Sequence, residues 1–295
     1  MRSVIADVYV ETKYRGGNVG FITTGNGVVC IDVPMMPGDV HRWLDQIRKV
    51  TRERIRFVVQ TDTDPGRIAS TNLIDAPIIA HDEAWGKMKR YHRETQIRRI
   101  QTLLGAPNDD LVWQVRMPEI TFGEQLVLEL EQKQVHILHI GGHSSAACMV
   151  CLPEDRLVFT GDVVFNDMHP TMTQAQSKQW LLALTKLRKM SIDIIVPGHG
   201  AVCDKRATRP LSSYLREMRA RVRRCFQAGQ SKAETSKAVI PEFIEAFPYK
   251  RNEMSGVQQR IKDACYRVYD EYRAATKATA PKRYRKKQVG EMPLL

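Results

Sequence analysis

Several common sequence features are missing from this chain of 295 residues. No apolar run approaches the ~20 residues that a membrane-spanning helix needs. The first residues, Met-Arg-Ser-Val-Ile-Ala-Asp-Val, reach an acid before any long apolar segment, which argues against a secretory signal peptide. The Gly-x-Ser-x-Gly, P-loop and Rossmann glycine patterns are also missing. We therefore expect a cytoplasmic protein without a membrane segment, and not a serine hydrolase or nucleotide-binding enzyme of those classes.

The cysteines do not form a disulfide or zinc pattern. There are six, scattered through apolar segments. Cys148 and Cys151 have the C-x-x-C spacing, but they lie inside an apolar strand, Ala-Ala-Cys-Met-Val-Cys-Leu. Alternation along a strand sends these two thiols to opposite faces. We therefore predict buried, reduced thiols, as is typical of cytosolic proteins.

The charge is concentrated at one end of the chain. Residues 205–295 contain 22 Lys and Arg against 9 Asp and Glu, whereas residues 1–204 contain 23 against 24. The apolar content of 43% is that of a soluble globular protein, long enough for one large domain with an appendage. Few aromatic residues accompany the basic ones, so we predict a solvated basic face and not a nucleic-acid site.

Hydrophobic periodicity predicts an alternation of strands and helices in the first two thirds of the chain and only helices after that. Strands are expected at 18–24, 28–33, 55–59, 76–80, 120–130, 134–140, 146–152, 157–160 and 192–196. Helices are expected from 39, N-capped by Asp39, from 81 to about 104, at 174–190, and at 211–228, 231–239 and 252–276. Two sets of strands with helices between and outside them predict an α/β protein, a four-layer αββα sandwich. The sandwich would span 1–205, a C-terminal helical extension 206–280, and a basic flexible tail 281–295.

Four apolar strands end in a carboxylate or an imidazole. The stretch 57–67 ends in Asp62 and Asp64, and His143 follows two glycines. Asp162 follows Gly161, and His199 lies in a Pro-Gly-His-Gly turn. A sheet holds such side chains rigidly, while the loops beside them leave room for a ligand. We therefore expect these residues to converge at one edge and bind a metal ion.

Three of these segments resemble a known family. Gly142-His143, Phe159-Thr-Gly-Asp162 and Val196-Pro-Gly-His199-Gly200 are similar to the later metal motifs of the metallo-β-lactamase-fold hydrolases, and most of all to their glyoxalase II-like branch. The resemblance covers about residues 7–205. It implies the αββα sandwich with a one- or two-metal centre at one edge. It also implies that His143 binds the first metal, Asp162 bridges both, and His199 binds the second.

The first motif departs from that family. Its members have His-x-His-x-Asp-His after an apolar strand, and this chain has Asp62-Thr-Asp64-Pro-Gly66-Arg67. Carboxylates replace two imidazoles, Gly66 replaces the acid that binds the second metal, and Arg67 replaces the last histidine. The roles of those four positions cannot be transferred.

Two interpretations of the altered stretch remain open. In the first, Asp62 and Asp64 join His143 and Asp162 around one divalent ion. Oxygen ligands favour Mn²⁺ or Fe²⁺ over Zn²⁺, and Asp64 replaces the missing catalytic base. In the second, no metal binds, because Asp62 and Asp64 cap loop amides and Arg67 pairs with Asp162.

The sequence predicts a metal-dependent hydrolase that attacks an ester, thioester or lactone with metal-activated water. The alternative is a catalytically degenerate fold-mate that serves as a binding or scaffold protein. Arg67 could also hold an anionic group of a small-molecule substrate, and His169 is expected at the rim of the substrate pocket. The sequence leaves open whether the C-terminal helices pair two chains in a homodimer.

Overall fold

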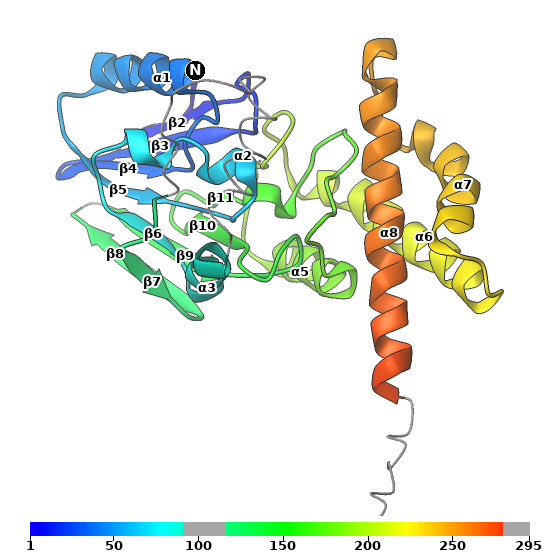
Figure 1. Cartoon of the computed structure of the whole chain (residues 1–295). Helices are drawn as coiled ribbons and strands as arrows, with labels where there is room; N and C mark the ends of the chain where they lie inside the picture. The colour runs from blue at the N-terminus through cyan, green and yellow to red at the C-terminus, as the bar shows by residue number, and fades with distance from the viewer. Residues whose placement is uncertain (91–115, 132, 280–295) are drawn as a thin grey trace, which may run out of the picture.

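The computed structural model describes residues 1–90, 116–131 and 133–279, and its strands form two sheets (Figure 1). The larger sheet has seven strands, adjacent in chain order. The first four are antiparallel and the last four are parallel, with β4 in both sets. Their bounds are β1 (Arg2–Ile5), β2 (Val8–Glu11), β3 (Val19–Thr24), β4 (Gly27–Ile31), β5 (Ile55–Val59), β6 (Ile78–His81) and β7 (Ile120–Phe122).

The smaller sheet has five strands in the order β12-β11-β10-β9-β8. All neighbours are antiparallel except β11 and β12, which are parallel. The bounds are β8 (Gln125–Leu130), β9 (Lys133–His139), β10 (Cys148–Leu152), β11 (Leu157–Phe159) and β12 (Ile194–Val196). The parallel pairing directs the carboxyl ends of β11 and β12 to one edge of this sheet.

The layers follow the predicted αββα order. Side chains from both sheets, such as Ile22, Val59, Ile137 and Val150, form one buried cluster between them. Helix α1 (Pro37–Val50) covers the outer face of the larger sheet, where it buries Trp43. Helix α5 (Ser177–Lys189) covers the outer face of the smaller sheet. The apolar stripe of each helix therefore completes a sheet that has both faces buried.

Three C-terminal helices pack on the α5 side of the sandwich: α6 (Thr208–Gln227), α7 (Lys232–Phe243) and α8 (Met254–Thr279) (Figure 1). Their apolar side chains share one buried cluster with α5, for example Leu215 and Ile261 with Leu184. The extension predicted from the sequence therefore has no core separate from that of the smaller sheet.

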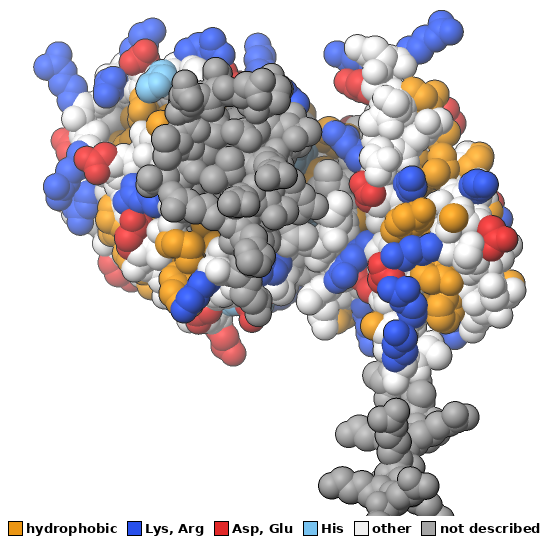
Figure 2. Space-filling model, viewed as in Figure 1, with side chains coloured by type: hydrophobic (Ala, Val, Ile, Leu, Met, Phe, Trp, Pro, Cys, Tyr) orange, Lys and Arg blue, Asp and Glu red, His pale blue; other side chains and the backbone are white. Residues whose placement is uncertain are grey.

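Basic side chains on these helices are spread out and not gathered in one patch. Acidic and apolar side chains lie among them on the face shown in Figure 2. Several are paired with acids of the neighbouring helix, as in Arg219 with Glu271 and Lys232 with Asp270. Mixed and paired charges of this kind are typical of a solvated face.

The sequence pattern does not predict β1 and β2, and two of its boundaries are wrong. The strand expected at 120–130 is two strands, because the chain turns at Gly123 and Glu124, and β7 and β8 then belong to different sheets. Helix α1 begins at Pro37, with Met36 and not Asp39 at its N-cap. Proline is favoured in a first helical turn because it lacks an amide hydrogen and has a helical φ. Asp39 instead pairs with Arg42.

The expectations for the cysteines and for the helix that follows β6 hold within the described residues. The thiol of Cys148 lies in the cluster between the sheets and that of Cys151 in the cluster with α5, so they face opposite sides. All six cysteines are free. The helix expected from 81 to about 104 is seen as α3 (Asp82–Arg90), and the rest of that prediction lies outside the described residues. Among the described helices, none is long and apolar enough to cross a membrane.

Candidate functional site

The residues predicted to bind a metal meet at the carboxyl ends of the central strands. Asp62 follows β5, Asp162 follows β11 and His199 follows β12, while His143 lies between β9 and β10. After Asp64 the chain enters the short helix α2 (Pro65–Ile68), which carries Arg67. The side chains form two buried groups, one around Arg67 and one around Asp62.

Arg67 is the centre of the first group, and its side chain is 1% exposed. Nη1 donates to Asp32 Oδ2 at 3.1 Å and to the carbonyl of Asn18 at 2.7 Å. Nη2 pairs with Asp162 Oδ1 and donates to the carbonyl of Gly198 at 2.9 Å, while Nε lies 3.5 Å from Asp162 Oδ2. Every nitrogen of the guanidinium thus has an acceptor within the protein. This is the pairing that the metal-free interpretation expects.

Small residues let the guanidinium reach this position. A Cβ atom on Gly17, whose φ is +126°, would lie 2.6 Å from Arg67 Nη2. A Cβ atom on Gly198 would collide with Asp162 Oδ1. Glycine is the only residue that leaves room for the ion pair at both places.

Asp62 and His143 form the second group. Asp62 Oδ2 lies 2.8 Å from His143 Nδ1, and both side chains are at most 2% exposed. Asp62 Oδ1 accepts hydrogen bonds from Ser144 Oγ at 2.6 Å and from the amide of Thr63 at 2.6 Å. His143 Nε2 lies 3.3 Å from Thr171 Oγ1. The carboxylate and the imidazole are therefore bonded to each other and to protein groups.

Asp64, predicted as a metal ligand and catalytic base, lies at the N-cap of α2. Its side chain accepts from the amide of Gly66 at 3.1 Å. Burial and the nearby charge of Asp162 raise the pKa of Asp64. The local bond is the one expected for an Asp-Pro-Gly turn.

The ion pairs shift the pKa values of the buried groups. Burial opposes the charge on Asp162, but Arg67 and His199 outweigh it and hold the pKa of that carboxyl well below its ordinary value. Burial also opposes the charge on His143, but the hydrogen bond and charge of Asp62 raise its pKa to about 9. Asp62 therefore favours the protonated form of His143, as Arg67 favours the ionised form of Asp162.

These residues do not fit a metal ion. Asp62 Oδ2 is paired with His143 Nδ1, and Asp162 is occupied by Arg67 and, at 3.3 Å, by His199 Nε2. Within the described part of the chain, no three His, Cys, Asp or Glu side chains are arranged to hold one. A divalent cation would also have to displace or repel the Arg67 guanidinium.

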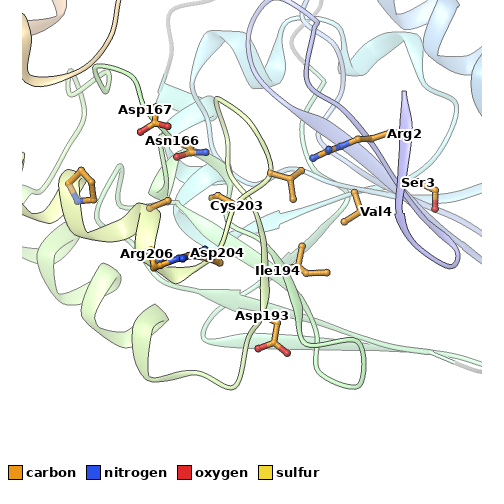
Figure 3. Close-up of a pocket in the computed structure, with 13 residues that line it drawn as sticks. Arg2, Ser3, Val4, Asn166, Asp167, Asp193, Ile194, Cys203, Asp204 and Arg206 are labelled. Carbon is orange, nitrogen blue, oxygen red and sulfur yellow. Dashed lines mark hydrogen bonds and ion pairs between the residues drawn. The ribbon is translucent and has the colours of Figure 1, made fainter.

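His169 is buried in the loop after Asp162, where its Nε2 lies 3.0 Å from the carbonyl of Ile244. It lines a cavity of about 670 Å³ between this loop and the start of α8, together with Gly200, Lys250 and Arg260. A different cavity of about 780 Å³ lies at the outer edges of the two sheets (Figure 3). None of the predicted site residues lines that second cavity.

Three residues of the site were not predicted. Asp32, at a φ of +56°, accepts from the amide and hydroxyl of Thr61 as well as from Arg67. The sequence pattern could have identified Asp32, because it too is an acid that directly follows an apolar strand, β4. Ser144 and Thr171 carried no such signal, because hydroxyl residues in loops are common.

The sequence of this region matches a known family. Residues 69–199 match the profile of the Metallo-beta-lactamase superfamily. The matched range contains His143, Asp162 and His199 but begins after Arg67, so it omits the altered stretch. No match was found among the curated proteins.

Among the solved structures with the same architecture are three proteins whose chains differ in length. A metallo-beta-lactamase from Pontibacter korlensis has a TM-score of 0.60 and 17% identity, covering 73% of this chain and 97% of its own. A metallo-beta-lactamase family protein from Thermus thermophilus has a TM-score of 0.67 and 14% identity, covering 94% and 96%. The sec-alkylsulfatase Pisa1 from Pseudomonas sp. has a TM-score of 0.70 and 13% identity, covering 92% and 49%. The chain therefore has the metallo-β-lactamase fold.

The match to the Thermus thermophilus protein covers 94% of this chain, so it extends beyond the two sheets into the helical extension.

Proposed function

We propose that this protein, a chain with the metallo-β-lactamase fold, functions without a metal ion at the strand-end site, as a binding or scaffold protein. The observation that carries the proposal is the position of Arg67. Its guanidinium lies between Asp32 and Asp162, the second of which bridges two metals in the family that the sequence resembles. A fixed protein cation supplies positive charge at that position.

Charge balance supports the same conclusion. The superfamily generally binds divalent metals such as zinc, whose charge compensates buried carboxylates. Here Arg67 compensates Asp32 and Asp162, and His143 pairs with Asp62. A buried charge without a partner is very costly, so these pairs account for how the carboxylates remain buried.

We place the ligand in the cavity of about 670 Å³ between the loop 166–169 and the start of α8. Its volume is in the range of small-molecule sites, which often lie where two packed units meet. Lys250 and Arg260 line it, together with the acids Asp167 and Glu253. The lining suits a small polar ligand with an anionic group, in a protein that we expect to be cytoplasmic.

Metal analysis and thermal unfolding test the proposal together. We expect purified protein from metal-supplemented cells to contain far less than one equivalent of Mn, Fe or Zn. Its melting temperature should be unchanged by a chelator, because an ion bound only to the folded state would stabilise it by mass action. About one equivalent of metal, or a drop of several degrees with the chelator, would contradict the proposal.

A second candidate is the metal-dependent hydrolase of esters, thioesters or lactones. The observation in its favour is that Asp62, Asp64, His143, Asp162 and His199 do gather at one edge, close enough for their charges to interact. In that case one ion, Mn²⁺ or Fe²⁺ before Zn²⁺, would need the Asp62–His143 pair to open. Asp62→Asn and His143→Gln should then both lower the metal content, whereas Asp45→Asn, on the exposed face of α1, should not.

A further inference from the structure

Three polar side chains in the Asp62 group lie in series. Thr171 Oγ1 is 3.3 Å from His143 Nε2, and His143 Nδ1 is 2.8 Å from Asp62 Oδ2. A hydroxyl, an imidazole and a carboxylate in this order are the arrangement used by hydroxyl nucleophiles, in which the third group orients the base. The three residues come from segments far apart in the sequence, so the fold alone brings them together.

We propose that Thr171, His143 and Asp62 form a metal-independent acyl-transfer site, with Thr171 as the nucleophile and a small activated ester as the class of substrate. The inference rests on the part of the proposed function that concerns the metal, because a bound ion would occupy His143 and Asp62.

The base and the orienting group are held firmly. Ser144 Oγ and the amide of Thr63 fix Asp62 Oδ1, so the other oxygen faces His143. The His143 ring packs edge-on against Trp180, with 5.3 Å between ring centroids. Its orientation toward Thr171 is therefore set by packing as well as by hydrogen bonds.

Thr171, the proposed nucleophile, is more exposed than His143 and Asp62, as the reaction requires. Asp62 and His143 are buried, whereas Thr171 is only half-buried. It lies in the loop between His169 and helix α5, on the side of His143 opposite Asp62. Of the three groups, the hydroxyl is thus the one that a ligand can reach.

The reaction balances with groups already present. Thr171 Oγ forms a bond to the acyl carbon and passes its proton to Nε2 of neutral His143, whose Nδ1 hydrogen is donated to Asp62. The bond from the acyl carbon to the leaving oxygen breaks, and His143 Nε2 gives its new proton to that oxygen or, when a phenolate leaves, to solvent, so the imidazole is neutral again. Water then attacks the acyl-threonine and gives one proton to His143 Nε2, and His143 returns a proton to Thr171 Oγ as the carboxylic acid leaves.

Acetylation by p-nitrophenyl acetate tests the proposal in the full-length protein. The assay runs in chelator, so that a bound metal ion cannot supply the nucleophile. We expect a burst of p-nitrophenol and an acetyl group mapped by peptide mass spectrometry to Thr171. Hydroxylamine should remove it, because it cleaves an ester at threonine but not an amide at lysine.

Matched variants separate catalysis from structure. Thr171→Val keeps the shape and should abolish the burst and the adduct, whereas Thr171→Ser should retain both. Thr173→Val, at an exposed position in the same loop, should behave as wild type. His143→Gln should slow acetylation at least about 100-fold, the range of general-base catalysis.

Three results would overturn the inference: no hydroxylamine-sensitive acetyl in wild type, an unchanged burst in Thr171→Val, or acetyl groups on lysines alone. Failure of the proposed function has a different signature. In that case the metal content is close to one equivalent and the burst depends on added metal, whatever the fate of Thr171.

Discussion

At the scale of single residues, Arg67 joins segments that are far apart in the chain. It contacts Asp32 after β4, Asp162 after β11, and carbonyl groups of residues 18 and 198. These segments belong to both sheets, so one buried cation connects the two halves of the sandwich. The connection depends on charge as well as shape, because both carboxylates need a partner.

Replacing Arg67 by Ala should destabilise the protein strongly. Loss of one member of a buried ion pair costs about 3–5 kcal/mol, because the remaining charges stay buried without a partner. Urea unfolding measures this free energy. Arg48→Ala is the matched control, since Arg48 is 74% exposed and pairs with the exposed Asp45; it should change little. Equal, small effects of the two substitutions would refute the structural role of Arg67.

The His143 pair should make stability depend on pH. Its pKa is raised from 6.5 to about 9 in the folded protein. A raised pKa means that the folded state binds the proton more tightly, so this stabilisation is complete below about pH 6.5 and is lost as the pH rises through 9. The loss is on the order of 3 kcal/mol. Urea unfolding between neutral pH and pH above 9 should show a decline in wild type that His143→Gln lacks.

At the scale of elements, one contact fixes the end of α5 to the helical extension. The N-cap of α5, Gln176, makes no side-chain hydrogen bond to the helix. Glu271 of α8 accepts instead from the amide of Ser177 at 2.7 Å and from its hydroxyl, and it pairs with Arg219 of α6 at 2.9 Å. A carboxylate from a different helix thus caps α5 and interacts favourably with its dipole.

Glu271→Ala should therefore lower the free energy of unfolding by about 1–2 kcal/mol, the usual cost of a lost cap. Thermal or urea unfolding provides the measurement. Glu217→Ala, on the exposed face of α6, is the control and should leave stability nearly unchanged. If both variants unfold alike, the cross-helix cap contributes nothing.

At the scale of the whole molecule, the sandwich and the C-terminal helices depend on each other. The cluster on the outer face of the smaller sheet includes Trp180 and Leu184 of α5 together with Leu211, Leu215 and Ile261 from the extension. Each of these side chains is buried, and a sheet that lost this cover would expose a large apolar surface. The two parts should fold as one cooperative unit.

A chain that ends at Asp204 should consequently fail to fold. We expect it to be insoluble, or to lack a cooperative urea transition, because burial of this apolar cluster is lost. A chain that ends at Thr279 keeps the whole described core and should unfold like the full-length protein. A soluble, cooperatively unfolding fragment 1–204 would contradict this dependence.

Local pattern was sufficient for much of the architecture. Alternation and helical periodicity depend on neighbouring residues, so the sequence alone predicted most strands of both sheets, but not β1 and β2, together with most of the helices and the αββα class. It also predicted which strand ends carry acids and histidines. It missed the switch between β7 and β8, because the partner that a strand pairs with is not encoded in its own pattern.

The chemistry of the site depended on the tertiary structure. From the sequence, Asp62 and Arg67 were compatible with a metal ligand and a substrate clamp, or with internal ion pairs. The fold brings Asp32 and Asp162 to Arg67, and His143 to Asp62, across separations of 35 to 95 residues. Whether a buried charge binds a metal or a protein partner is decided by which opposite charge lies nearest, and only the folded chain sets that distance.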